Sequence, residues 1–176
     1  ALEGNLAALE EGERAFAFAS GLAAEDTLLH ATCRPGDHVV IPDDAYGGTF
    51  RLVDKVATRW GLGYDAAPVS DVDAVRAAIR PGTTKLVWVE TPTNPLLNIG
   101  DIEALAALAH DAGALLVVDN TFASPYLQQP LALGADVVVH STTKYVGGHS
   151  DVVGGALVVK DLEVAEQVGF HQNAMG

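Results

Sequence analysis

The chain has 176 residues, of which 49% are hydrophobic and 19% charged, a composition typical of one globular domain. Its formal net charge of −13 argues against a nucleic-acid or anionic-membrane surface, because such surfaces need clustered basic side chains. The single cysteine, Cys33, excludes an internal disulfide and a cysteine metal cluster. No signal-peptide pattern and no membrane-length apolar run is seen, so the sequence indicates a cytoplasmic protein.

Segments that suit strands alternate with segments that suit helices along the whole chain. The predicted strands are short apolar runs bounded by turn residues, at 15–19, 38–41, 85–90, 114–118, 135–140 and 155–159. The predicted helices, counted from a capping residue where one is present, cover 1–11, 22–32, about 48–60, 71–79 and 101–112, with a helix or connector at 161–175. Because both termini fall inside such segments, we expect a fragment of a longer protein.

The order of these elements predicts the fold class. The strands are continuous apolar runs, as expected when helices cover both faces of a sheet, so we predict a three-layer α/β domain with a mostly parallel sheet. Ligands of such domains bind at the carboxyl ends of the strands. Ser20, the Pro42–Asp43 pair, Asn94 and Asp119 fall at such ends, and Lys144 lies four residues beyond another.

Lys144 is the first candidate catalytic residue. It follows a buried strand and two hydroxyl residues, and it precedes a pair of glycines. A lysine in this setting can form a Schiff base with a carbonyl cofactor, whereas most lysines lie on the surface. Asp119, at the end of an earlier strand, can hold the ring nitrogen of pyridoxal 5′-phosphate (PLP) protonated. Taken alone, Asp119 is equally well explained as a turn or helix-capping aspartate.

Further residues suit the other parts of this cofactor. The N–H groups of Ser20, Gly21 and Leu22, at the start of a helix, can bind a phosphate, although such a start is also an ordinary helix cap. Hydroxyl donors can come from the opposite side, from Ser141 and Thr143. Tyr46 is expected to stack on the cofactor ring and to help transfer protons. Asn94 and Thr121 are expected to contact the cofactor. Each of these three residues also has an ordinary loop or turn interpretation.

The sequence contains no motif typical of other classes of ligand. The sequence lacks the glycine fingerprint of dinucleotide-binding folds and the phosphate loop of nucleotide triphosphatases. Its six histidines show no zinc-ligand spacing, so no metal is expected. A generic nucleotide binder and a non-catalytic assembly module on the same fold are the rival hypotheses. The combination of Lys144, Asp119 and Tyr46 argues against both.

Several blocks of the sequence resemble the Cys/Met-metabolism family of fold-type I PLP enzymes. They run in order along the chain, at 18–24, 44–49, 90–95, 118–122, 141–145 and 148–151. The resemblance implies the large PLP-binding domain of an aspartate-aminotransferase-like fold. It also implies that Lys144 is the Schiff-base lysine and Asp119 the partner of the pyridine nitrogen. The phosphate ligands would be Gly21, Leu22, Ser141 and Thr143, with Tyr46 as the stacking ring and Asn94 and Thr121 lining the cofactor.

The resemblance also implies an activity, because the family removes or replaces the γ-substituent of C4 amino acids. The blocks at 34–50 and 121–130 favour a bacterial transsulfuration enzyme of the cystathionine γ-synthase type, acting in methionine biosynthesis. Cystathionine γ-lyase and O-acylhomoserine sulfhydrylase activities remain as alternatives. Methionine γ-lyases usually carry a cysteine two residues after the stacking tyrosine, where this chain has Gly48.

The resemblance further predicts what the chain lacks. Residues 1–176 correspond to the central part of the PLP-binding domain. In the family, an N-terminal segment supplies a tyrosine and an arginine to the neighbouring subunit, and a C-terminal domain supplies the arginine that binds the substrate carboxylate. We therefore expect a parent protein that is a homotetramer acting on small amino acids, and a fragment that turns over poorly by itself.

Overall fold

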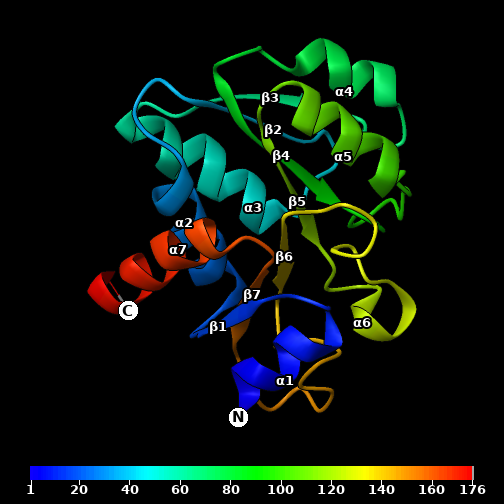
Figure 1. The fold of residues 1–176 in the computed structure, drawn as a ribbon. Helices are drawn as coiled ribbons and strands as arrows, with labels where there is room; N and C mark the ends of the chain where they lie inside the picture. Colours follow the sequence, from blue (N-terminus) through cyan, green and yellow to red (C-terminus); the bar gives the residue numbers. More distant parts are fainter. Residues whose placement is uncertain (176) are drawn as a thin grey trace.

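The six predicted apolar runs and one further strand form a seven-stranded sheet in the computed structural model, which describes residues 1–175 (Figure 1). The strands are β1 Arg14–Phe18, β2 His38–Pro42, β3 Gly63–Ala67, β4 Thr84–Glu90, β5 Leu115–Asp119, β6 Val137–His140 and β7 Gly155–Val159. Their order across the sheet is β1-β7-β6-β5-β4-β2-β3.

The sheet is mostly parallel, as predicted. Strands β3, β2, β4, β5 and β6 pair in parallel, whereas β7 runs antiparallel to both of its neighbours, β6 and β1. Because β7 alone is reversed, β1 points in the same direction as the parallel strands. The carboxyl ends of β1, β2, β4, β5 and β6 therefore reach the same edge of the sheet, where the sequence predicted a ligand site.

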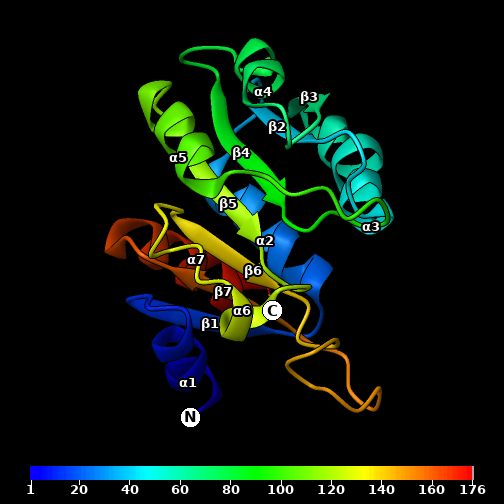
Figure 2. The ribbon, with the colours of Figure 1, turned by 90° about the vertical axis from the view of Figure 1, so that its right-hand side faces the viewer.

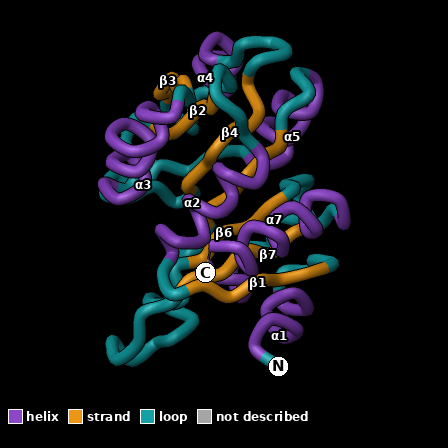
Figure 3. Tube along the Cα trace, turned by 90° about the vertical axis from the view of Figure 1, so that its left-hand side faces the viewer, coloured by secondary structure: helices purple, strands orange, loops and turns teal. Residues whose placement is uncertain are grey.

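Helices cover both faces of the sheet and complete three layers (Figures 2 and 3). Successive strand residues point to opposite faces, so Val117 belongs to one buried apolar cluster and Val118 to the other. The helices against the Val117 face are α2 Gly21–Thr32, α3 Gly47–Arg51 with its continuation, and α7 Leu162–Met175. Those against the Val118 face are α1 Leu2–Leu9, α4 Val72–Ala78 and α5 Ile102–Asp111.

Side-chain caps fix the starts of three helices where the sequence predicted them. The Ser20 hydroxyl accepts a hydrogen bond from the Ala23 N–H at 3.1 Å, before α2. Asp71 and Asp101 cap α4 and α5 in the same way through their carboxylates. The caps hold each helix start close to the end of the preceding strand or loop.

The structure departs from the sequence prediction in three short segments. Strand β3 was not predicted, because Gly63–Ala67 contains no apolar run and owes its form to pairing with β2 at the sheet edge. The helix predicted at 48–60 changes its winding after α3, to a π-helix η1 Leu52–Val56 and a 3₁₀ helix η2 Ala57–Trp60. A one-turn helix, α6 Ser124–Leu127, was also missed.

Cys33 is buried, with 3% of its surface exposed, and burial raises the pKa of its thiol to about 11. Among residues 1–175, no helix has the length and the apolar character needed to cross a membrane.

Candidate active site

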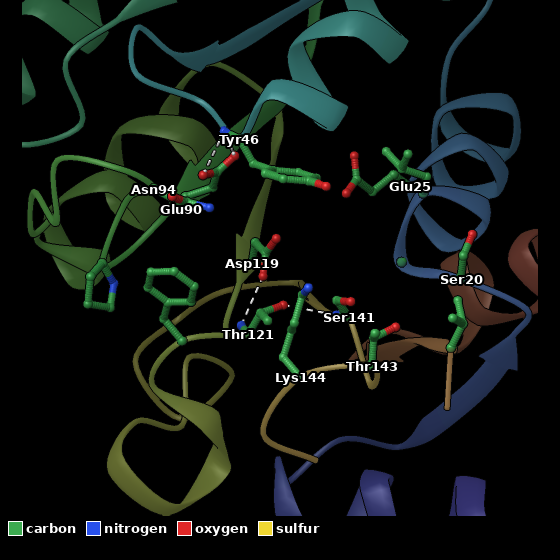
Figure 4. Close-up of a pocket in the computed structure, with 15 residues that line it drawn as sticks. Ser20, Glu25, Tyr46, Glu90, Asn94, Asp119, Thr121, Ser141, Thr143 and Lys144 are labelled. Carbon is green, nitrogen blue, oxygen red and sulfur yellow. Dashed lines mark hydrogen bonds between the residues drawn. The ribbon is translucent and has the colours of Figure 1, made fainter. Parts of the chain in front are cut away.

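A cavity of about 230 Å³ opens at the carboxyl edge of the sheet (Figure 4). All ten residues predicted as site residues line it: Ser20, Gly21, Leu22, Tyr46, Asn94, Asp119, Thr121, Ser141, Thr143 and Lys144. They come from segments more than a hundred residues apart in the chain, and the carboxyl ends of five strands, β1, β2, β4, β5 and β6, bring them together. The lining also includes five residues that were not predicted: Glu25, Glu90, Pro92, Phe122 and Val153.

One wall of the cavity is the N-terminus of α2. The N–H groups of Gly21 and Leu22 lie in the first turn, so they have no acceptor within the helix. A Cβ atom on Gly21 would lie 3.2 Å from the Cβ atom of Ser141, which is tighter than an ordinary contact. Glycine at this position therefore lets the helix start approach the loop after β6, and the two segments form a cradle for an anion.

The loop after β6 carries Ser141, Thr143 and Lys144. The Ser141 N–H donates to the Thr121 hydroxyl at 2.9 Å, which ties this loop to the end of β5. The Thr143 hydroxyl donates to the Gly154 carbonyl at 3.1 Å and accepts from the Gly154 N–H at 3.0 Å. Within residues 1–175 the Ser141 hydroxyl has no such partner, so it is the freer donor of the two. The exposed Lys144 side chain points into the cavity toward Asp119 (Figure 4).

Asp119 ends β5 in the middle of the cavity floor. One carboxylate oxygen accepts a hydrogen bond from the Thr121 N–H at 2.9 Å. Burial raises the pKa of Asp119, and the bonds from Thr121 together with the nearby His140 oppose this shift. A cationic or N–H donor group placed against the carboxyl would offset the cost of burying its charge.

Glu90 lies beside Asp119, in register with it on the neighbouring strand. Both carboxylate oxygens of Glu90 accept from the Tyr46 N–H, at 2.8 and 2.9 Å, so this strand end fixes the backbone of Tyr46. Burial first, and then the charge of Asp119, raise the pKa of Glu90 to about 8. The Tyr46 ring lies over the cavity and is 43% exposed, which leaves one face available to a flat ligand.

The loops after β2 and β4 are tied to each other beside Asn94. The Thr93 hydroxyl donates to the Asp44 carboxylate at 2.5 Å, and the Asn98 amide donates to the same oxygen at 3.1 Å. These bonds hold the loop that carries Tyr46 against the loop that carries Asn94. Both residues reach the cavity from this pair of loops.

Behind the strand ends lies a buried polar cluster formed by Glu10, Asn120 and His140. Glu10 Oε1 accepts from Asn120 Nδ2 at 2.8 Å and lies 2.5 Å from His140 Nε2, and all three side chains are fully buried. Asn120 follows Asp119 in the chain, and His140 precedes Ser141. The end of α1 thus supports the two segments that carry the candidate catalytic residues.

The unpredicted lining residues carried only partial signals in the sequence. Glu90 ends a strand as Asp119 does, and Phe122 belongs to a block of family resemblance, yet neither was given a role. Glu25 lies four residues after Gly21, which places it on the same face of α2 as the anion cradle. A glutamate on a helix is normally exposed, so only the tertiary structure reveals this position.

The residues of the cavity fit PLP in chemical type. The α2 start and Ser141 offer donors to a phosphate, Asp119 offers a carboxyl to a ring nitrogen, and Lys144 offers an amine to an aldehyde. Tyr46 offers an aromatic face. The close approach of Gly21 and Ser141, which a side chain at position 21 would disturb, supports the same assignment.

Comparisons with known proteins agree with this assignment. The family model of Cys/Met metabolism PLP-dependent enzymes matches residues 1–176. A cystathionine gamma-synthase of Mycobacterium tuberculosis is 66% identical over 176 residues, which are 100% of this chain and 45% of the relative. A cystathionine beta-lyase of Lactococcus lactis is 52% identical over 100% of this chain and 46% of its own length.

Solved structures show the same likeness. The crystal structure of metB from Corynebacterium glutamicum matches with a TM-score of 0.97 and 58% identity, over 99% of this chain and 45% of that one. A cystathionine gamma-lyase from Lactobacillus plantarum, solved with L-serine, matches with a TM-score of 0.96 and 51% identity over 99% of this chain. The chain spans about half the length of these relatives, and its predicted fold class is confirmed.

Proposed function

Because the chain belongs to the Cys/Met metabolism family of PLP-dependent enzymes, we propose that its parent protein is a cystathionine γ-synthase. In this reaction cysteine sulfur replaces the acyloxy group on the γ-carbon of an O-acyl-homoserine. The C–O bond breaks, a C–S bond forms, and the carboxylic acid leaves with the proton of the thiol. The relatives named for this activity, at 66% identity, support the choice.

The observation that carries the proposal is the convergence of Lys144, Asp119 and the α2 start on one cavity. When bound, PLP supplies an electron sink that stabilises the loss of a proton from the α-carbon of an amino acid. The chain's own residues have separate tasks. Lys144 would hold the cofactor through its amine and, when free, would move protons, and Asp119 would hold the ring nitrogen protonated.

The remaining residues position the ring. Gly21, Leu22 and Ser141 hold the phosphate group, with Thr143 beside them through the loop that its hydroxyl braces. Tyr46 would cover one face of the ring, while Asn94 and Thr121 would line the cofactor. Phe122 and Val153 add apolar side chains to the lining of the cavity.

Cystathionine γ-lyase is the second candidate, because a protein of that name shares 51% identity and a TM-score of 0.96 with this chain. An O-acylhomoserine sulfhydrylase would use the same cofactor residues. A methionine γ-lyase suits this site less well. A Cβ atom on Gly48 would lie 2.4 Å from the Tyr46 ring, so a cysteine there would force the tyrosine to move.

The assembly and location of the protein are parts of the same proposal. We propose that residues 1–176 form the central part of the PLP-binding domain of a longer chain, in a cytoplasmic homotetramer. Large apolar side chains at the surface support an interface, since Tyr126 is 92% exposed, Leu127 74% and Leu96 67%. The negative net charge fits small amino-acid substrates better than nucleic acid or anionic lipid.

The decisive experiment uses the full-length protein purified with PLP. It receives an O-acyl-homoserine with and without cysteine, or cystathionine alone, and the products are identified by mass spectrometry. Cystathionine formed only when both substrates are present supports the synthase. Breakdown of cystathionine to cysteine, 2-oxobutanoate and ammonia, with little synthesis, would replace the synthase by the γ-lyase and leave the cofactor site intact.

A further inference from the structure

Glu25 is an unusual residue for the wall of a cofactor cavity. It lies one helical turn after Gly21, on the face of α2 that continues from the anion cradle. Only 4% of its surface is exposed, and its carboxyl group lines the cavity. Figure 4 shows this carboxyl pointing inward, toward the side on which the Tyr46 hydroxyl lies.

The Glu25 carboxyl has few polar contacts. Its Oε2 atom is buried and makes no hydrogen bond to any of residues 1–175. The Thr49 hydroxyl, on α3, lies close by, yet it is also buried without a hydrogen-bond partner. A buried carboxylate without partners costs several kcal/mol, so the group avoids its charged form.

The charges that face Glu25 also favour its neutral, protonated form. The cavity lining contains three carboxyl groups, of Glu25, Glu90 and Asp119, and Lys144 is the cationic side chain among the described lining residues. Burial, and then the charge of Asp119, raise the pKa of Glu25 well above its ordinary value; Thr49 opposes the shift and Glu90 adds to it. A phosphate entering the cradle would bring further negative charge to this wall.

We propose that Glu25 is a positioning residue for the cofactor that acts as a neutral carboxylic acid, and that its ionisation expels PLP. As the acid, Glu25 offers an O–H donor and a carbonyl acceptor to the cavity without adding charge. As the carboxylate, it repels the phosphate group and becomes a third negative side chain beside Asp119 and Glu90. The inference rests on the proposed PLP site and adds to it a proton that must be present for binding.

The direction of the pH dependence follows from this assignment. Below the pKa of Glu25 in the empty site, cofactor affinity is independent of this group. Above it, each step in pH weakens binding, because the group must take up a proton when the phosphate enters. Glutamine at position 25 keeps the shape and a hydrogen-bond donor but cannot ionise. The PLP affinity of Glu25→Gln should therefore lack the part of the pH dependence that Glu25 causes.

The test measures the equilibrium affinity of the full-length apoenzyme for PLP between about pH 7 and about pH 9.5. We expect the affinity of the unsubstituted protein to fall at least about tenfold more over this range than that of Glu25→Gln. Glu90 is present in both proteins, so its own ionisation contributes to both profiles and the difference between them reports the group at position 25. Asp26→Asn is the matched control, because it removes the neighbouring carboxyl, whose side chain is 40% exposed, and should leave the pH profile unchanged.

The outcomes separate this inference from the proposed function. If the unsubstituted protein binds PLP and Glu25→Gln has the same pH profile within about twofold, the role of Glu25 is wrong and the PLP site stands. If the unsubstituted protein does not bind PLP at any pH, both are wrong. Should Glu25→Gln not fold, Glu25→Leu decides in its place, since leucine also cannot ionise and must likewise remove the pH component.

Discussion

Removing Glu10 should destabilise the protein strongly, although the residue lies outside the cavity. Its Oε1 atom is the partner of Asn120 Nδ2 at 2.8 Å and of His140 Nε2 at 2.5 Å, and all three side chains are fully buried. In Glu10→Ala, both nitrogens lose this partner in a site that water does not reach. Removing one member of a buried hydrogen-bonded pair costs about 3–5 kcal/mol, because the other member loses its partner. We expect Glu10→Ala to lower the free energy of unfolding by an amount in this range.

Urea unfolding of the apoprotein measures the loss, provided that the slope with denaturant is unchanged. Glu13→Ala removes a nearby exposed carboxylate and should change the unfolding free energy by less than about 0.5 kcal/mol. The double variant Glu10→Leu with His140→Phe should lose less than the two single variants together, because neither member of the Glu10–His140 pair is left without the other. Asn120 Nδ2 then keeps its bond to the Gln128 carbonyl. A loss below about 1 kcal/mol in Glu10→Ala would refute the reasoning.

Four further predictions follow from the site and the core. Lys144→Ala should abolish the yellow colour that borohydride removes, as read by absorbance, whereas the exposed Lys55→Ala should keep it. Gly21→Ala should weaken PLP binding about tenfold in an equilibrium titration, because its Cβ would crowd Ser141. The raised pKa of Glu90, about 8, means that the folded state holds a proton which the unfolded state loses near pH 4.5, so stability falls as pH rises between these values. Glu90→Gln should reduce that fall by up to about 1.4 kcal/mol per pH unit in urea unfolding series, and an unchanged slope would contradict it. The Cys33 thiol should resist alkylation at neutral pH until denaturant is added, as mass spectrometry can follow.

The sequence was most informative where residue type and strand ends coincide. The place of Lys144 and Asp119 in the cavity was predictable because Asp119 ends one buried apolar strand, Lys144 follows another by four residues, and the two residue types together are chemically specific. Strand β3 was not predictable, because its residues carry no apolar run and become a strand only by pairing with β2. The π-helical and 3₁₀ turns at 52–60 likewise depend on how that segment packs against the sheet.

Carboxyl groups show most clearly what could not be predicted from the sequence. Nothing in the local sequence separates Glu25 from its helical neighbour Asp26, yet one lines the cavity and the other contacts His30 at the surface. Their difference arises from the packing of α2 between the sheet and α7. The partners of Glu10 lie 110 and 130 residues further along the chain, and such distant pairings leave no local pattern.

The reversed strand β7 has a consequence for the support of the α2 start. Strand β1, near the start of the described residues, contacts the sheet through β7, which follows the other six strands in the chain. Gly155, at the start of β7, packs so closely on Ser20 that a Cβ atom would lie 2.1 Å from the Ser20 carbonyl oxygen. The contact between Gly155 and Ser20 therefore makes β7 part of the support for the α2 start, together with the direct approach of Gly21 to Ser141. A chain that ends before β7 would contain Lys144 but would lack the strand that joins β1 to the sheet.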